Sequence, residues 1–385
     1  MNKLNAIFFL VFGLNLGTVA AQNFPKLGND TLLDVACWNV EWFGDTGNGP
    51  NDETTQFNNV KALLDKTELD VLGLCEISNL TTYNTLSTQL SSKYDTYIST
   101  FSATQKMALY WRKNMFDVIG FETLNILATE NFTFASRPPL QVCLKTKTGN
   151  KIDTIYFIVV HLKAISDLDS YNRRKAASGL LKTYVEATLK DKKYIILGDW
   201  NDDLDASTYQ SAETPFKNFL DAKYTFPSKE LTDAGKSSYA FNVNMIDHIM
   251  NSKTLDSFYL KGSAKVFDNA ATYATNFSNT TSDHWPVFAF YDWKKLTTLT
   301  IPIGKESYEK LAEVKVWPNP FSNEITIQLS TAGFEVQVFN INGTRLYESI
   351  AIQAEKTINT EDFPSGMYFI SINQNGQTFH AKMIK

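Results

Sequence analysis

The feature that most restricts how this chain can fold is a series of short apolar runs, spread between residues 31 and 293, that are typical of β-strands. Seven runs stand out, namely LLDVACWNV, DVLGLCEI, MALYWRK, TIYFIVVHL, YIILGD, MIDHIM and VFAFYDW. Segments 54–66 and 170–190 show helical periodicity. Strands interspersed with helices predict sheets covered by helices, in one α/β domain of roughly 270 residues.

Polar side chains of the kind that bind metals or transfer protons lie at or near the ends of these runs. In chain order they are Asn39, Glu76, His161, Asp199, Asn201, Asp247, Asp283 and His284. Strands that carry polar groups to a common sheet edge build a rigid site, so we expect these residues to converge. Asp199 and Asn201 are two positions apart and would point to the same side if their strand continues.

The residue types in this set favour a hard divalent cation. Carboxylate and amide oxygens suit Mg²⁺, Mn²⁺ or Ca²⁺. The three cysteines, Cys37, Cys75 and Cys143, show no CxxC spacing and argue against a zinc cluster. We expect them to be buried small hydrophobes; a Cys37–Cys75 disulfide is the alternative in an exported protein.

The motifs WNVEWF, LCEI, SRPPL, VVHLKA, LGDWND, MIDHIM and SDHWPV, in this order, resemble those of the endonuclease/exonuclease/phosphatase family. The resemblance covers about residues 33–292. It implies a four-layer α-β-β-α sandwich as the catalytic domain, which we place at 31–293, and a phosphoesterase that depends on Mg²⁺ (or Mn²⁺ or Ca²⁺).

The same resemblance implies a role for each site residue. Glu76 would be the principal metal ligand, with Asn39 and Asp283 completing the metal site. Asp199 would activate the attacking water, and His161 would act as an acid toward the leaving oxygen. Asn201 would donate to the phosphate and Arg137 would bind it as a cation. His284 would contact the phosphate, with Asp247 as its partner.

Three positions depart from the family pattern or invite another interpretation. Gln105 stands where the deoxyribonuclease I branch carries a Glu that supports the second histidine. His248 should point away from the side of Asp247, because side chains alternate along a strand. The basic run 172–175 at the start of a helix is more often a solvated face than a patch that binds a phosphate backbone.

The two ends of the chain indicate export. A basic start, a short apolar run and small residues predict a signal peptide at 1–21. After a linker at 294–312, residues 313–385 predict a small all-β sandwich. Its segments VWPNPFSNEITI, VFNINGTRLY, FPSGMYFI and KMIK resemble the type IX secretion C-terminal sorting domain of Bacteroidetes. That resemblance implies Sec export, contact with the type IX machinery and a secreted or cell-surface location; a sandwich that binds carbohydrate or a partner is the alternative.

Several substrates remain open. The net charge of −5 gives no sign of a broad basic surface, and no uninterrupted apolar run reaches about 18 residues, so we expect no stable membrane insertion. We expect a monomeric, secreted endonuclease acting on DNA and/or RNA. The alternatives are a sphingomyelinase-type phospholipid diesterase, an inositol-phosphate phosphatase, and a binding protein that retained the fold without activity.

Overall fold

The computed structural model describes residues 23–128, 133–149, 151–297, 314–341, 344–374 and 377–385. The expected signal peptide at 1–21 lies outside these residues, and so does most of the expected linker at 294–312. The first residues of that linker belong instead to a short helix, α7 (Trp293–Thr297).

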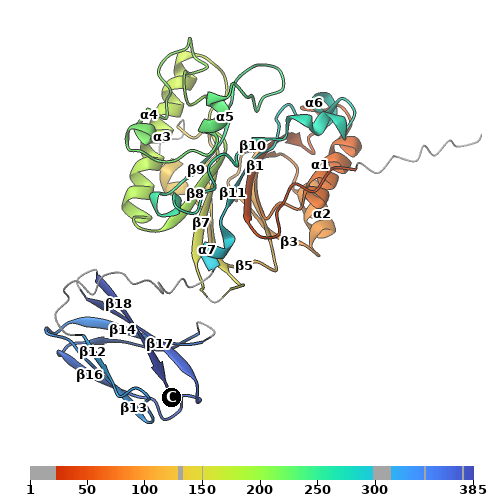
Figure 1. The fold of residues 1–385 in the computed structure, drawn as a ribbon. Helices are drawn as coiled ribbons and strands as arrows, with labels where there is room; N and C mark the ends of the chain where they lie inside the picture. The colour runs from red at the N-terminus through yellow and green to blue at the C-terminus, as the bar shows by residue number, and fades with distance from the viewer. Residues whose placement is uncertain (1–22, 129–132, 150, 298–313, 342–343, 375–376) are drawn as a thin grey trace, which may run out of the picture.

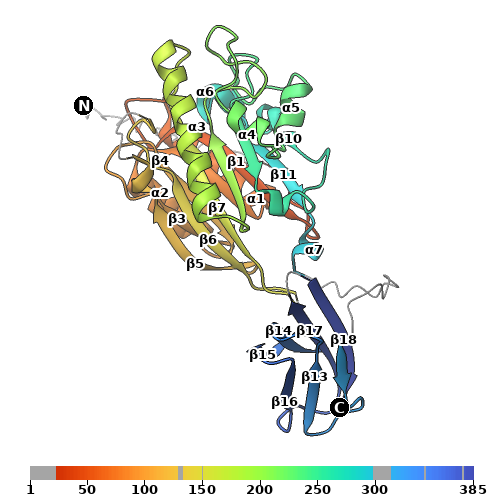
Figure 2. The same ribbon diagram turned by 90° about the vertical axis from the view of Figure 1, so that its left-hand side faces the viewer.

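Residues before the linker form two β-sheets that pack face to face (Figures 1 and 2). The six-stranded sheet has the order β10-β11-β1-β2-β4-β3, and the five-stranded sheet has the order β5-β6-β7-β8-β9. The strands are β1 (Leu33–Phe43), β2 (Val71–Ile77), β3 (Tyr94–Ile98), β4 (Lys106–Arg112), β5 (Phe116–Thr123), β6 (Leu140–Thr146), β7 (Thr154–His161), β8 (Lys193–Asp199), β9 (Asp247–Asn251), β10 (Lys265–Val266) and β11 (Val287–Tyr291).

Helices cover the outer faces of both sheets (Figure 1). The helices are α1 (Glu53–Thr67), α2 (Leu80–Leu90), α3 (Leu168–Thr188), α4 (Lys217–Asp221), α5 (Lys229–Asp233) and α6 (Phe277–Thr280), with short 3₁₀ turns at Asn125–Ala128, Lys253–Leu255 and Asp268–Thr272. Side chains of α1, α2 and α6 pack on the six-stranded sheet. Those of α3 and α4 pack on the five-stranded sheet. A third apolar cluster fills the space between the sheets, so the expected α-β-β-α sandwich is confirmed.

The pairing of the strands brings their polar ends to one edge. β1 and β2 are parallel, as are β7 and β8, so each pair ends at the same edge. His161 is level with Asp199, and Asp199 is level with Asp247 on the antiparallel β9. Gly198 allows β8 to reach this edge: its φ is +133°, and a Cβ there would lie 2.1 Å from the Val160 carbonyl oxygen.

Residues after the linker form a separate all-β unit of two antiparallel sheets. One has the order β12-β13-β16 and the other β15-β14-β17-β18. Their bounds are β12 (Lys315–Trp317), β13 (Glu324–Gln328), β14 (Phe334–Asn340), β15 (Arg345–Ala351), β16 (Glu355–Asn359), β17 (Met367–Gln374) and β18 (Gln377–Ile384). Apolar side chains from both sheets form one core, which confirms the expected sandwich.

The cysteines are free and buried. The Cys37 thiol faces the His248 carbonyl at 3.7 Å and the Cys75 thiol faces the Val160 carbonyl at 3.3 Å. The interpretation as buried small hydrophobes therefore holds, and no Cys37–Cys75 disulfide is formed. Among the described helices, none has the length and apolar character that a bilayer crossing demands.

Candidate active site

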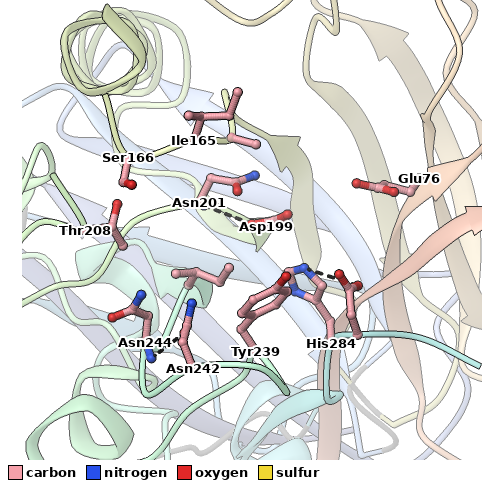
Figure 3. Close-up of a pocket in the computed structure, with 13 residues that line it drawn as sticks. Glu76, Ile165, Ser166, Asp199, Asn201, Thr208, Tyr239, Asn242, Asn244 and His284 are labelled. Atoms are coloured by element: carbon pink, nitrogen blue, oxygen red, sulfur yellow. Dashed lines mark hydrogen bonds and ion pairs between the residues drawn. The ribbon is translucent and has the colours of Figure 1, made fainter. Parts of the chain in front are cut away.

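A cavity of about 350 Å³ opens at the edge where the strand ends meet. Figure 3 shows Glu76, Asp199, Asn201 and His284 around this space. Asp283 also lines it. These five residues are spread over more than two hundred positions of the chain, and the structure brings them together as the sequence predicted.

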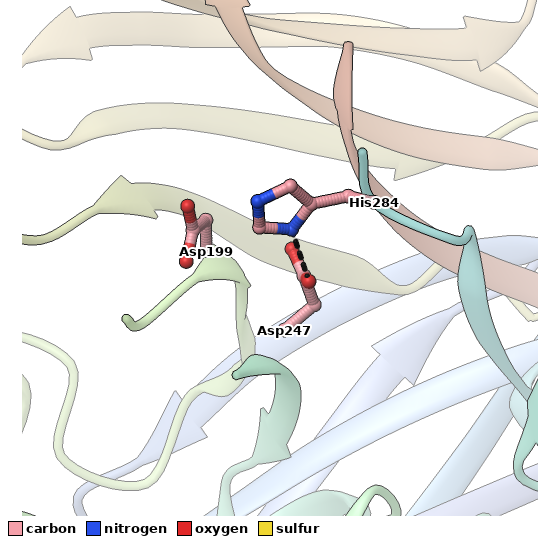
Figure 4. Close-up of side chains that lie close together, drawn as sticks. All are labelled: Asp199, Asp247 and His284. Atoms are coloured by element: carbon pink, nitrogen blue, oxygen red, sulfur yellow. Dashed lines mark hydrogen bonds and ion pairs between the residues drawn. The ribbon is translucent and has the colours of Figure 1, made fainter. Parts of the chain in front are cut away.

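His284 and Asp247 form a buried pair, with the His284 Nδ1 and Asp247 Oδ2 atoms 2.7 Å apart (Figure 4). Burial alone would lower the pKa of His284, but Asp247, together with Asp199 and Asp283, raises it well above its usual value. An imidazolium is therefore the resting form of His284, ready to donate from Nε2.

Asp199 lies beside this pair. Burial and the nearby Asp247 carboxylate raise the pKa of Asp199. Ligand-type atoms of Asp199, Asp247 and His284 lie within 4.8 Å of one another, so the three could hold a metal ion by geometry alone. The imidazolium offsets only one of the two carboxylate charges, and its direct contact with Asp247 favours proton and phosphate chemistry at this trio.

Asn39 organises the neighbouring carboxylates. Its Nδ2 donates to Glu76 Oε1 at 3.1 Å and to Asp199 Oδ2 at 3.0 Å. Its Oδ1 accepts from the backbone N–H of Glu41 at 2.9 Å. Both groups of the amide thus have protein partners, and this geometry favours a positioning role for Asn39 over the direct metal ligation expected from the sequence.

Glu41 is a site residue that the sequence reasoning missed. Its Oε2 accepts from the backbone N–H of Asp283 at 2.9 Å. Burial, then the charges of Asp283 and Glu76, raise the pKa of Glu41 to about 7. Burial also raises the pKa of Asp283, with a contribution from Glu76. The signal was present in the motif WNVEW, where Glu41 stands two residues after Asn39.

The carboxylates of Glu41, Glu76 and Asp283 offer oxygen donors of the kind that a hard cation prefers. Burial, reinforced by neighbouring carboxylates, raises the pKa values of Glu41 and Asp283. Glu41 and Glu76 have φ angles of +45° and +64°. Backbone of this kind is costly for residues with a Cβ and is concentrated at functional sites.

A turn places Asn201 at the cavity, and not the continuing strand that the sequence analysis considered. β8 ends at Asp199, and Asn201 has a φ of +56°, so the strand does not continue. Instead the Asn201 backbone N–H donates to Asp199 Oδ1 at 2.9 Å and closes a turn. The Asn201 Nδ2 donates to the Leu162 carbonyl at 3.1 Å, which leaves its second amide hydrogen for a ligand.

His161 lies beside the carboxylates of Glu76 and Asp199. Its Nε2 is 3.5 Å from both Glu76 Oε1 and Asp199 Oδ2. Its Nδ1 has no hydrogen-bond partner. Burial, with a further effect of Arg137, lowers the pKa of His161 well below its usual value. The acid role of His161 toward the leaving oxygen stays a prediction.

Gln105 supports Arg137, not His161. Arg137 Nη1 donates to Gln105 Oε1 at 2.6 Å, and Nη2 donates to the Leu162 carbonyl at 2.8 Å. The Arg137 side chain is 8% exposed, and its buried Nε has no partner. Arg137 and His161 line a second hollow next to the first.

The expectation that the basic run 172–175 is a solvated face is wrong for Arg174. This side chain is completely buried and its Nε donates to Asp202 Oδ2 at 2.8 Å. Its Nη1 donates to the carbonyls of Lys163 and Ile165, each at 2.8 Å. Arg174 therefore fixes the loop after β7 to the loop after β8.

The titratable His248 and the aromatic Tyr239 are two further residues next to the site residues. His248 points away from Asp247, as expected, and its ring nitrogens contact Ser228 Oγ and the Asp202 carbonyl, each at 2.9 Å. The Tyr239 ring packs edge-on against His284, with 5.2 Å between ring centroids. No sequence signal singled out Tyr239, because its loop carries none of the quoted motifs.

Two central sheets with helices on their outer faces, and a cavity of carboxylates and histidines at one edge, make this an α-β-β-α sandwich with a polar site between strand ends. The model of the Endonuclease/Exonuclease/phosphatase family matches residues 36–284, and the chain belongs to this family. The family is hydrolytic, and most of its members are phosphoesterases or nucleases. The model of the secretion system C-terminal sorting domain matches residues 315–385, so the chain also carries a type IX sorting tail.

Solved structures of the same fold agree with this assignment. An endonuclease/exonuclease/phosphatase protein from Bacteroides vulgatus superimposes with a TM-score of 0.52 at 16% identity, covering 68% of this chain and 98% of that one. TDP2 of D. rerio, humanized by 14 mutations, gives a TM-score of 0.50 at 14% identity, covering 68% and 99%. At these identities the likeness shows the fold alone.

One curated relative matches over a short segment. The ulvan lyase NLR42 of Nonlabens ulvanivorans is 37% identical over 79 residues, which is 20% of this chain. The match spans 15% of the length of that enzyme. A match this short does not carry the activity of the relative to this chain.

Proposed function

We propose that this protein is a secreted, divalent-metal-dependent phosphodiester hydrolase, and specifically an endonuclease acting on DNA and/or RNA. One observation carries the proposal: the carboxylates of Glu76 and Asp283 share a cavity with His284, which is paired with the buried Asp247. Phosphodiester hydrolysis needs positive charge at the reacting phosphate, and in this cavity a bound cation and the His284 imidazolium would supply it.

The metal site would consist of Glu76, Glu41 and Asp283, and we favour Mg²⁺, with Mn²⁺ or Ca²⁺ as alternatives. When bound, the cation would polarise a phosphoryl oxygen and stabilise the negative charge that develops on it. Asn39 would orient Glu76 and Asp199 through the two hydrogen bonds of its Nδ2.

The remaining residues would handle the proton and the phosphate. Asp199, with its raised pKa, would accept the proton of the attacking water. His284 Nε2 and the free amide hydrogen of Asn201 would donate to the phosphate oxygens, and Asp247 would keep His284 protonated. His161 would act in its neutral form, and Arg137 would contribute positive charge next to the phosphate.

The nucleic-acid assignment has support from one neighbour of the same fold. TDP2 of D. rerio, in a structure complexed with a single-strand DNA product, superimposes with a TM-score of 0.51 at 13% identity. Because a protein of this fold is complexed with a DNA strand, a nucleic-acid strand is the substrate that we favour here.

A phospholipid diesterase is the second candidate, and one structural feature favours it. Ile165, Phe241 and Val243 lie on the rim of the cavity and are 65%, 60% and 84% exposed. Their neighbours Ser166, Asn242 and Asn244 line the cavity itself. Apolar side chains at the mouth of a catalytic cavity could contact a lipid surface.

The location of the protein follows from its two ends. We propose that residues 1–21 are a signal peptide for Sec export, and that the sorting tail then engages the type IX secretion machinery. The catalytic unit would be released or held at the cell surface.

Purified protein should nick supercoiled plasmid DNA in the presence of Mg²⁺, and EDTA should stop the reaction. The same preparation should be assayed on RNA, sphingomyelin and inositol phosphates, with the His284→Gln variant as the matched control. Turnover of sphingomyelin without nicking would support the second candidate. If no substrate is hydrolysed with Mg²⁺, Mn²⁺ or Ca²⁺, the hydrolase proposal is wrong and a binding role replaces it.

A further inference from the structure

Two aspartates are buried side by side at the end of the six-stranded sheet that lies away from the active site. Asp34 is the second residue of β1, and Asp70 directly precedes β2, the parallel neighbour of β1. The register pairs Val35 with Val71, so the two aspartates that precede them are level with each other. The Asp34 backbone N–H donates to Asp70 Oδ2 at 3.0 Å. The active-site residues of both strands lie toward their other ends.

Both side chains are withdrawn from solvent. Asp34 is 1% exposed and Asp70 is 7% exposed. Burial, then the charge of Asp70, raises the pKa of Asp34 to about 8, and burial raises the pKa of Asp70 to about 7. Neither carboxylate forms an ion pair with a basic residue in the described part of the chain. Two adjacent acids in this environment are costly unless something neutralises them.

The nearby cations are held by other acids. Lys26 Nζ is 2.6 Å from Asp30 Oδ1 and 3.1 Å from Glu68 Oε2. Arg112 Nη2 is 3.8 Å from Glu68 Oε2 and donates to the Glu68 carbonyl at 3.2 Å. Arg112 lowers the pKa of both buried aspartates, but burial raises it by more, and the charge of Asp30 raises it further. The basic side chains of this region therefore do not neutralise the pair.

One oxygen of the pair has no partner within the protein. Asp34 Oδ2 accepts from the Asn29 backbone N–H at 2.8 Å, whereas Asp34 Oδ1 is buried and has no hydrogen-bond partner. A buried polar atom of this kind is commonly the contact point of an ordered water or an ion. A water would leave the charges of Asp34 and Asp70 uncompensated, whereas a divalent cation would neutralise both.

Neutral oxygen donors lie next to the two carboxylates. A Cβ at Gly28 would lie 2.2 Å from the Glu68 carbonyl oxygen and 2.8 Å from Asp34 Oδ2, so these two oxygens face the same point. Asp70 also lines a hollow of about 420 Å³ together with Glu68. Ca²⁺ accepts about six to eight carboxylate, carbonyl and water oxygens in a flexible geometry, whereas Mg²⁺ demands a near-ideal octahedron. This irregular donor set therefore favours Ca²⁺.

We propose that Asp34 and Asp70, with the Glu68 carbonyl, form a Ca²⁺ site that is separate from the active site and stabilises the fold. Glu68 caps the C-terminal end of α1, so the bound ion would join this helix to the starts of β1 and β2. Without Ca²⁺, a proton would take its place on Asp34. The inference does not depend on the proposed hydrolase activity.

Calcium-dependent stability of the full chain tests this site. The background for the experiment is the Glu76→Gln/Asp283→Asn variant, in which the proposed catalytic metal site is disabled. After metals are removed with EDTA and dialysis, millimolar CaCl₂ at pH 8 should raise the melting temperature of this variant by at least ~3 °C, because an ion that binds only the folded state stabilises it. Differential scanning calorimetry measures the increase, and MgCl₂ should give a smaller one.

Asp34→Asn/Asp70→Asn, added to the same background, should abolish the increase. The amides keep the size of the side chains and an oxygen for each N–H donor, but they carry no charge. Asp95→Asn/Asp117→Asn removes two carboxylates whose side chains are 52% and 48% exposed, and this matched control should keep the increase. Because protons compete with a cation for carboxylates, the increase should also shrink from pH 8 to pH 5.

Isothermal titration with CaCl₂ provides a second readout. Asp34→Asn/Asp70→Asn should remove one Ca²⁺ site from the background protein, and Asp34→Asn alone should weaken that site at least ~10-fold. If both the melting temperature and the titration respond to Ca²⁺ equally with and without these substitutions, or do not respond in the background protein, the site is overturned. Either result leaves the hydrolase proposal intact, and failure of the hydrolase proposal on every substrate would leave the Ca²⁺ site in place.

Discussion

Arg174 on α3 and Asp202, three residues beyond the end of β8, form an ion pair of 2.8 Å in which both side chains are 0% exposed. Asp202 also accepts from Ser207 Oγ at 2.8 Å and from the Thr208 backbone N–H at 2.6 Å. The pair thus joins the loop that carries Lys163 to the loop that follows Asp199.

Arg174→Ala should lower the free energy of unfolding by about 3–5 kcal/mol, because it leaves the Asp202 carboxylate buried without a compensating positive charge. Urea denaturation followed by circular dichroism measures this change. Lys175→Ala, at the next and exposed position of the same helix, should change stability by less than about 0.5 kcal/mol. Equal stabilities of the two variants would show that the ion pair does not clamp the loops.

His284→Gln should lower kcat for plasmid nicking at least ~10²-fold, because the amide carries no charge and cannot stabilise the developing negative charge as an imidazolium does. Asp247→Asn should give a smaller loss, since it weakens the protonation of His284 without removing the ring. Nicking rates under saturating Mg²⁺ measure both effects, and melting temperatures confirm that the variants fold. His380→Gln, an exposed position in the sorting tail, serves as the control. Full turnover in His284→Gln would rule out this assignment.

Glu41→Gln should weaken Mg²⁺ binding at least ~10-fold. Mutation of a residue that only hydrogen-bonds to a metal ligand weakens metal binding by about this factor or more, and loss of a ligand itself should weaken it at least as much. Glu76→Gln should weaken it similarly. Isothermal titration with Mg²⁺ or Mn²⁺ reports the affinity without any substrate. Glu122→Gln, on the exposed face of β5, should bind metal as the wild type does. Wild-type affinity in Glu41→Gln would return the ligand role to Asn39.

The sequence predicted the parts of the fold that are buried on both faces. β1, β2, β7 and β8 lie between the other sheet and a helix layer, so they appear as continuous apolar runs. β5 was missed because only its two end residues are buried and Gly120 lies at a register shift. α2 was missed because Thr, Ser and Asn are weak helix formers; capping by Asn79 and packing of its apolar side chains sustain it.

Site residues at the ends of strands could be predicted from the sequence. Site residues whose position depends on contacts with distant parts of the chain could not. Glu41 reaches the Asp283 backbone N–H from a backbone with a φ of +45°, and this conformation could not be predicted from the motif WNVEW. Arg174 is buried because Asp202, 28 residues later, folds back onto it. The run of basic residues at 172–175 alone could not show whether Arg174 is buried or lies on a solvated face of the helix.

The final prediction concerns stability and pH, at a cluster outside the active site. Asp34 is 1% exposed; its Oδ2 accepts from the Asn29 backbone N–H at 2.8 Å and its Oδ1 has no partner. Burial, then the nearby Asp70 carboxylate, raises the pKa of Asp34 to about 8. The folded protein therefore keeps a proton that the unfolded chain releases near pH 4. Stability from this group is full below that pH and is lost progressively as the pH rises toward 8.

Asp34→Asn removes the ionisation and keeps an oxygen for the Asn29 N–H. The melting temperature of the variant should therefore exceed that of the wild type by an amount that grows between pH 5 and pH 8. Differential scanning calorimetry at several pH values in this range measures the difference. Asp95→Asn, at a position that is 52% exposed in its side chain, should show no such trend. A constant or shrinking difference for Asp34→Asn would mean that Asp34 is ionised in the folded protein throughout this range, with its charge compensated despite its burial.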